Sequence, residues 1–195
     1  MKRFRKYLNI FIILTVFISW GRLSFFGGKG FMSQENLRSL RYFTILSNIL
    51  EAIASLVWLW KKDEKFKYVA AVSVGVTFIV VLSFLGPTMG YRVMFAGATF
   101  WLHGAVPVIA ILEMIFLCEE EMGRKDNIIA CLPVLIYGVA YLLNNLINGI
   151  GVWPYTNDWY GFLRWGYPVG VVMFTVLILV IYLIGLSLRK LMIRL

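Results

Sequence analysis

Six long apolar segments constrain the fold of this sequence more than any other feature. Each is about 20 residues long, the length that an α-helix needs to cross the hydrocarbon core of a bilayer. They cover approximately Tyr7–Phe26, Leu40–Trp60, Tyr68–Leu85, Phe95–Leu117, Ile128–Asn148 and Tyr167–Leu188. Hydrophobic residues make up 61% of the chain, against about half in a soluble domain. We therefore expect an all-α fold, a single polytopic domain over residues 1–195 built as a bundle of six transmembrane helices.

The basic residues between these segments predict the orientation of the chain. If the N-terminus lies inside, thirteen Lys and Arg residues, Arg5 and Lys67 among them, fall in inner segments and six in outer ones. Because cytoplasmic loops carry the excess of Lys and Arg, both termini are expected in the cytoplasm, with the plasma membrane as the expected location.

The formal charge of +9 fits the same interpretation, since the basic residues flank spans and face anionic lipid. No nucleic-acid partner is expected. Two cysteines, Cys118 and Cys131, and one histidine are too few for a closed zinc site, so neither a metal nor a cofactor is expected.

The second apolar segment carries polar residues at helical spacing. They fall at i, i+3, i+4, i+7 and i+11, on one face of a helix, and are Thr44, Ser47, Asn48, Glu51 and Ser55. Such a face must look into the bundle or a wet cavity, because polar groups facing lipid are costly. Interhelical hydrogen bonding explains the serines. A carboxyl near mid-membrane indicates a functional role or a specific partner for Glu51.

The fourth segment holds the single histidine, His103, four residues before Pro107. A proline has no N–H to donate, so in an α-helix the His103 carbonyl would lose its partner and the helix would bend. The pair reads equally well as a functional site or as an ordinary proline kink.

A shared depth connects these residues. With 1.5 Å of rise per residue, Thr44 and His103 both lie ~6–12 Å below the outer boundary. Three side-chain amides of the fifth segment lie at about the same depth: Asn144, Asn145 and Asn148. They could support a site or have a purely structural role. A threonine hydroxyl is a weak nucleophile until a base such as neutral imidazole takes its proton. An oxyanion would then need donors, which these amides or Arg41 could supply.

Three motifs resemble one family of six-span membrane proteins. They are the second-span segment Arg41–Asn48, the fourth-span segment Leu102–Pro107 with Glu113 beyond it, and the loop segment Gly151–Tyr155. The sequence resembles proteins related to the androgen-induced gene and the androgen-dependent TFPI-regulating protein, and especially their bacterial "Pr-six-Pr" relatives. The resemblance implies an intramembrane threonine hydrolase of fatty-acid esters, with Thr44 as nucleophile and His103 as base.

Two other functions remain open at this stage. Glu51 could carry a proton or an ion in a non-enzymatic lipid-binding or transport protein. The same Thr and His could also serve an acyltransferase, with another acceptor in place of water.

Overall fold

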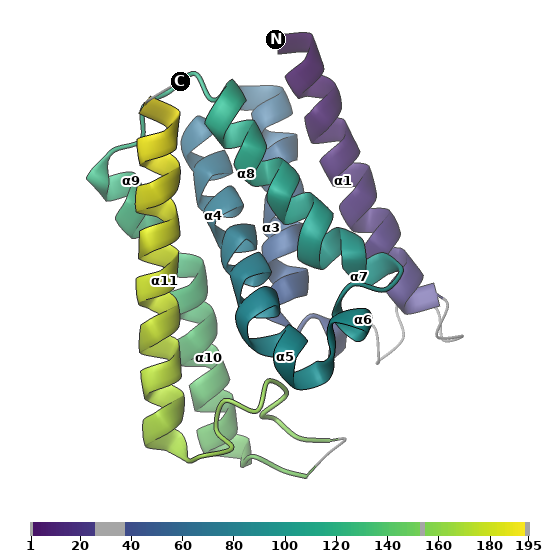
Figure 1. Ribbon diagram of the computed structural model, residues 1–195, viewed down its shortest axis with the longest axis vertical. Coiled ribbons are helices and arrows are strands. Elements are labelled where there is room, and N and C mark those ends of the chain that lie inside the picture. Colours follow the sequence, from purple (N-terminus) through teal and green to yellow (C-terminus); the bar gives the residue numbers. More distant parts are fainter. Residues whose placement is uncertain (1, 26–37, 153–154, 194–195) are drawn as a thin grey trace.

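The computed structural model describes residues 2–25, 38–152 and 155–193. Six helical segments in this part of the chain are long and apolar enough to cross a membrane. In Figure 1, α1 begins and α11 ends at the same end of the bundle. We call this the terminal end, marked by Lys2, Glu64 and Leu117, and the other the far end, marked by Phe43 and Met89. The chain is an all-α, integral-membrane bundle, as predicted.

In the described part of the chain, the six spans are built from eleven helical elements, and a twelfth, α6, lies between the third and fourth spans. The first two spans are α1 (Lys2–Phe25) and α3 (Phe43–Lys61). The third joins α4 (Glu64–Val80), the π-helix η1 (Val81–Leu85) and α5 (Gly86–Met89). After α6 (Tyr91–Met94), the fourth joins α7 (Ala98–Phe100), the π-helix η2 (Trp101–Ala105) and α8 (Val106–Leu117). The fifth joins α9 (Arg124–Ile129) and α10 (Leu132–Asn148), and the sixth is α11 (Tyr167–Ile193).

Several boundaries differ from the sequence-based ones. The third span begins at Glu64 rather than Tyr68 and continues through Pro87 to Met89. Consequently Lys67, expected in an inner loop, lies inside the bundle. The fifth span begins at Arg124 rather than at Ile128. The predicted end of the first span, Phe26, and the loop residues 153–154 lie outside the described residues.

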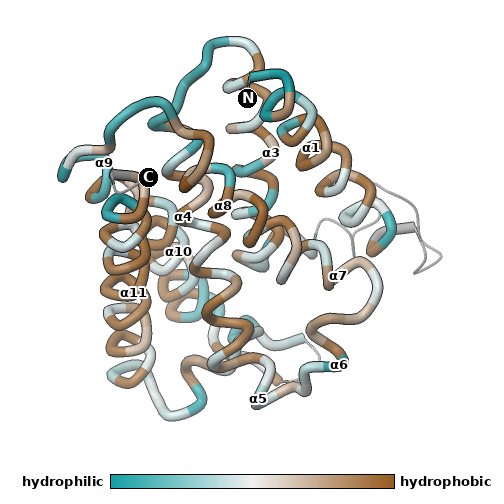
Figure 2. Tube along the Cα trace, turned by 45° about the horizontal axis from the view of Figure 1, so that its top comes forward, coloured by the Kyte–Doolittle hydropathy of each residue, from teal (hydrophilic) through white to brown (hydrophobic). Residues whose placement is uncertain are grey.

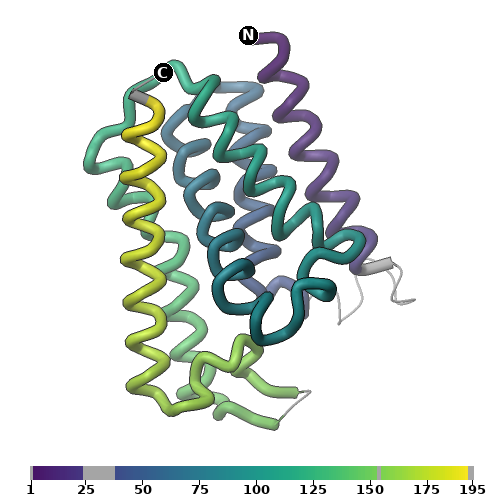
Figure 3. The backbone as a smooth tube through the Cα atoms, in the orientation of Figure 1, coloured from purple at the N-terminus to yellow at the C-terminus, as the bar shows by residue number. Residues whose placement is uncertain are grey.

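Helix α4 lies at the centre of the bundle. The contacts place it against α3, α8 and α11, and Figure 3 shows it between these neighbours. Small residues such as Ala70, Ala71 and Ser73 are fully buried along it, so the neighbouring backbones can approach closely. A left-handed residue, Lys62, ends α3, and the Asp63 side chain caps α4 by accepting the Phe66 N–H at 2.9 Å.

The outer helices present apolar side chains outward. Val172, Leu179 and Leu183 of α11 are each more than half exposed. Figure 2 shows hydrophobic colour along the helices and hydrophilic colour mainly at the connections on the terminal end. This is the distribution expected where lipid surrounds the helices and water meets their ends.

Both π-helices precede a proline by the same spacing. Residues Val81–Leu85 are followed by Pro87, and Trp101–Ala105 by Pro107. In each, the residue after the π-helix donates five residues back: Gly86 to the Val81 carbonyl and Val106 to the Trp101 carbonyl. Wider π turns therefore accommodate both prolines within continuous spans.

Candidate functional site

The predicted polar face of α3 is buried along its whole length. Thr44 is 8% exposed, and Ser47, Asn48, Glu51 and Ser55 are at most 1% exposed. The face therefore looks into the bundle, as the spacing predicted. Its far-end half borders a cavity, and its terminal-end half meets a set of buried charges.

Thr44 and His103 line one cavity at the far end. The cavity has a volume of about 360 Å³ and is walled by residues from α3, α6, η2 and the loop before α11, among them Thr44, Met94, Leu102, His103, Trp159 and Tyr160. This volume lies within the range of small-molecule sites, about 300–1,000 Å³. The structure thus brings together the two residues that the sequence placed at one depth.

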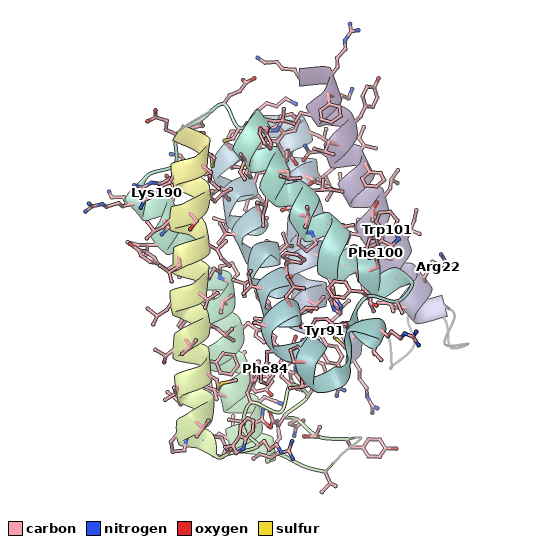
Figure 4. All side chains as sticks on the ribbon, viewed as in Figure 1. Arg22, Phe84, Tyr91, Phe100, Trp101 and Lys190 are labelled. Atoms are coloured by element: carbon pink, nitrogen blue, oxygen red, sulfur yellow. The ribbon has the colours of Figure 1, made fainter. Side chains whose placement is uncertain are left out.

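The imidazole of His103 is held in one tautomer. Its Nδ1 lies 2.6 Å from the Met94 carbonyl oxygen. A carbonyl oxygen only accepts hydrogen bonds, so Nδ1 carries the proton and Nε2 is the basic nitrogen. Trp101, two residues before His103 and labelled in Figure 4, packs edge-on against Phe11 of α1, with ring centroids 6.2 Å apart. These contacts fix η2 and its histidine against two other elements.

Asn48 connects the backbone of Thr44 to the backbone of Leu102, the residue before His103. Its Nδ2 donates to the Thr44 carbonyl at 2.7 Å and to the Leu102 carbonyl at 2.9 Å. The sequence predicted that Pro107 would leave the His103 carbonyl without its partner. In the π register, however, a carbonyl faces the residue five positions on, so Pro107 faces Leu102 instead. The Asn48 amide supplies the donor that Pro107 lacks.

The loop before α11 contributes aromatic groups that the sequence assigned to membrane anchoring. The Tyr160 hydroxyl accepts the Phe43 N–H at 2.8 Å and also lies in hydrogen-bonding contact with Thr44. Burial raises the pKa of Tyr160 to about 12, and the hydrogen bonds from Phe43 and Thr44 offset part of the rise. Tyr160 therefore keeps its proton at neutral pH.

The same loop is fastened to α10 by buried hydrogen bonds. Asp158 accepts from the Tyr141 hydroxyl and, at 3.0 Å, from the Leu163 N–H. Trp159 donates to the Tyr137 hydroxyl at 2.9 Å, and Tyr137 donates to the Arg41 carbonyl at 2.7 Å. These bonds hold Trp159 and Tyr160 over the cavity.

The other predicted supporting residues lie outside this cavity. Asn145 is fully buried and donates to the carbonyls of Tyr141 and Asn157, which ties the loop to α10. Asn144 and Asn148 are bonded to each other on the outer side of α10. The Arg41 guanidinium lies over the rings of Tyr42 and Trp159. Among the hydroxyls that line the cavity, that of Tyr160 is in hydrogen-bonding contact with Thr44.

Glu51 meets a buried cation that the sequence placed in a loop. Lys67 donates to Glu51 and Ser55, and its Nζ lies 3.3 Å from Glu113 Oε2. Arg5, also assigned to a flank, is 3% exposed and bonds to Glu113 and Glu64. One signal could have revealed these partners: two carboxyls inside apolar segments require cations at their depth, and Arg5 and Lys67 each lie within two residues of the start of a predicted apolar segment.

Among the residues that the structure describes, no group of three His, Cys, Asp or Glu side chains is arranged to hold a metal ion. Fold and site together define a six-helix integral membrane protein with a hydroxyl and an imidazole on one far-end cavity. No family model, curated protein or solved structure matches this chain.

Proposed function

We propose that this protein is an intramembrane hydrolase of lipid esters, of the fatty-acid ester type, with Thr44 as nucleophile and His103 as base. The observation that supports the proposal most directly is that both side chains line one cavity while Met94 holds His103 with Nε2 unprotonated. The sequence resemblance described above supports the same assignment.

The reaction is a two-step acyl transfer. The Thr44 Oγ1 attacks the ester carbonyl carbon, and the hydroxyl proton passes to His103 Nε2. The C–O bond of the tetrahedral adduct then breaks, the leaving alcohol takes the proton from His103, and an acyl-Thr44 ester remains. Water attacks this ester, gives a proton to His103 and releases the fatty acid; the proton returns to Thr44 Oγ1.

Tyr160 is the donor for the developing oxyanion in this proposal. Its hydroxyl accepts the Phe43 N–H and is in hydrogen-bonding contact with Thr44, and in this proposal its hydrogen is donated to the oxyanion. Its pKa of about 12 means that the hydrogen is retained over the working pH range. Preformed donors of this kind contribute about 10²–10³ in rate.

The test is labelling of purified protein with a serine/threonine-directed probe, followed by mapping of the modified residue and assay of fatty-acid ester hydrolysis. Thr44→Ser should keep labelling and turnover, whereas Thr44→Ala and His103→Gln should each lose at least ~100-fold. Thr77→Ala is the matched control, because Thr77 is a buried hydroxyl that bonds to Ser47 at 2.9 Å outside the His103 cavity. Full activity in both Thr44→Ala and His103→Gln would refute the proposal. Product analysis with alcohol acceptors separates hydrolysis from acyl transfer.

The proposed orientation places the terminal end in the cytoplasm of a plasma-membrane protein. With Arg5 and Lys67 buried in the bundle, ten of the described Lys and Arg residues remain on the terminal-end side against five on the far-end side. The positive-inside rule therefore still favours cytoplasmic termini. Reporter tags at both termini that respond only to periplasmic or extracellular reagents would contradict this orientation.

A further inference from the structure

Five charged side chains form a continuous buried network in the terminal-end half of the bundle. It starts at Glu64, whose carboxylate makes two bonds of 2.6 Å with the Arg5 guanidinium. Arg5 Nε donates to Glu113 at 2.9 Å. Lys67 lies between Glu113 and Glu51. The network crosses α1, α8, α4 and α3 and reaches the middle of the α3 span.

The network contains one more carboxyl than cations. Three carboxyls, Glu51, Glu64 and Glu113, face two cations, Arg5 and Lys67. A second observation locates the imbalance: within the described part of the chain, Glu51 Oε2 and Glu113 Oε2 are buried and have no hydrogen-bond partner, and only Glu113 Oε2 has a cation beside it, Lys67 Nζ at 3.3 Å. An unpaired buried negative charge costs several kcal/mol, and a proton on one of these oxygens removes it.

The contacts identify the carboxyl that holds this proton. Glu64 forms a two-bond pair with Arg5 and also accepts from Trp58 at 3.0 Å, so it is fully compensated as an anion. Glu113 accepts from Arg5 and Asn9 and lies near Lys67. Among the residues that the structure describes, Glu51 has only Lys67 as a charged partner and shares it with Glu113.

Water has a route to the start of the network. A cavity of about 180 Å³ at the terminal end is lined by Lys2, Arg5, Lys62 and Glu64, among others. The Arg5–Glu64 pair therefore borders a site large enough for several waters. From this pair, charged side chains contact one another in succession as far as Glu51, with no apolar residue between them.

We propose that the Glu51–Lys67–Glu113 cluster is a proton-binding site, which holds one exchangeable proton on Glu51 at neutral pH and exchanges it with the terminal end. The site is independent of the ester hydrolysis proposed above. Glu51 is one helical turn from Asn48, on the same face of α3, so the proton lies next to the side chain that supports the far-end cavity.

Infrared difference spectroscopy of the full-length protein in lipid nanodiscs tests this site. The wild type should show the C=O band of a protonated carboxyl at neutral pH, and the band should shift on transfer to D₂O. Glu51→Gln and Glu113→Gln each leave two carboxyls for two cations, so each should abolish the band. Lys67→Gln leaves one cation for three carboxyls, and the band should grow about twofold.

Asp158→Asn is the matched control, since it removes a buried carboxyl at the other end of the bundle whose two oxygens already accept hydrogen bonds. This variant should keep the band. A wild-type spectrum without a protonated carboxyl at neutral pH overturns the proposal, as does a band that survives Glu51→Gln and Glu113→Gln or disappears in Asp158→Asn. A variant that does not fold is replaced by the other Gln variant, and esterase activity has no bearing on the readout.

Discussion

The Asn48 side chain donates to the Leu102 carbonyl across the α3–η2 interface, at 2.9 Å. A second carbonyl stands in the equivalent place: Leu82 lies five residues before Pro87, and the Tyr91 hydroxyl donates to it at 2.8 Å. In both π-helices a side chain from elsewhere supplies the hydrogen bond that the proline cannot. Asn48 does so in the interior, next to the candidate catalytic pair.

Replacing Asn48 by Leu is expected to lower the free energy of unfolding by about 1–3 kcal/mol or more, because two buried carbonyls lose a donor. The measurement is the free energy of unfolding in detergent. Tyr91→Phe is the control and should cost less, since Tyr91 is half exposed at the far end, where interfacial water can replace its hydroxyl. Equal losses in the two variants would contradict this account.

Restoring the backbone donor should compensate for the loss of Asn48. Pro107→Ala adds an N–H that can reach the Leu102 carbonyl, so the double variant Asn48→Leu/Pro107→Ala should recover about 0.5–3 kcal/mol relative to additivity. The double-mutant cycle is measured by unfolding. Pro133→Ala, at the start of α10 and away from Asn48, should show no coupling with Asn48→Leu.

The sequence predicted the elements whose signals are local. Six apolar segments gave the six spans, and the spacing of Thr44, Asn48 and Glu51 gave the buried face of α3. Helical rise put Thr44 and His103 at one depth, and in the structure both residues line one cavity. Each of these inferences depends on one helix at a time.

The rest depends on contacts between elements. The proline in the sequence shows that one carbonyl lacks its usual N–H donor. That this carbonyl is the one of Leu102 follows only from the π-helical register, and the bond from Asn48 is visible only in the structure. A charge at a span end usually indicates a loop, and only the carboxyls of other helices make burial of Arg5 and Lys67 favourable. On α10, packing turns Asn145 rather than Asn144 inward.

Tyr160→Phe is expected to lower kcat for ester hydrolysis by about 100-fold with little change in KM, because the donor acts on the oxyanion and not on the bound ester. Since the pKa of Tyr160 is about 12, the wild-type rate should show no alkaline decline from this group at pH values well below 12. The pH profile and the kcat–KM split are the measurements. Tyr155→Phe is the control, as Tyr155 is 76% exposed. A purely structural role would lower stability and leave kcat unchanged.

Cys118 is expected to resist alkylation in the folded protein. Burial raises the pKa of its thiol to about 12, with a smaller contribution from Glu64. The thiolate is the reactive form of cysteine. In a Cys131→Ser variant at neutral pH, maleimide should therefore label Cys118 at least about 100-fold more slowly in the folded protein than in the protein unfolded in SDS. Because the folded pKa is the higher one, this thiol's contribution to stability is complete below the unfolded pKa, about 8.5, and declines as pH rises toward 12. Equal labelling rates would contradict the raised pKa of this partly buried thiol.

Gly185→Ala is expected to disrupt the packing of three helices, α4, α9 and α11, where they meet. The Tyr68 hydroxyl of α4 lies 2.9 Å from Asn127 Oδ1 of α9 and 2.8 Å from the Gly185 carbonyl oxygen of α11, and its one hydrogen is shared between these two acceptors. A Cβ at position 185 would lie 1.8 Å from Asn127 Oδ1 and 2.8 Å from the Tyr68 hydroxyl, so both side chains must move.

We expect this variant to lose about 1–3 kcal/mol of unfolding free energy, the usual cost of overpacking. Gly75→Ala is the matched control in α4. Its added Cβ would meet only side-chain methyls, Ile111 Cδ1 at 3.2 Å and Ile184 Cγ2 at 3.3 Å, which need to move by a few tenths of an ångström. Alanine favours a helix by about 1 kcal/mol over glycine, which offsets this movement. Gly75→Ala should therefore be nearly neutral in the same unfolding measurement. If the two variants unfold alike, Gly185 is not what allows α11 to approach Tyr68 and Asn127.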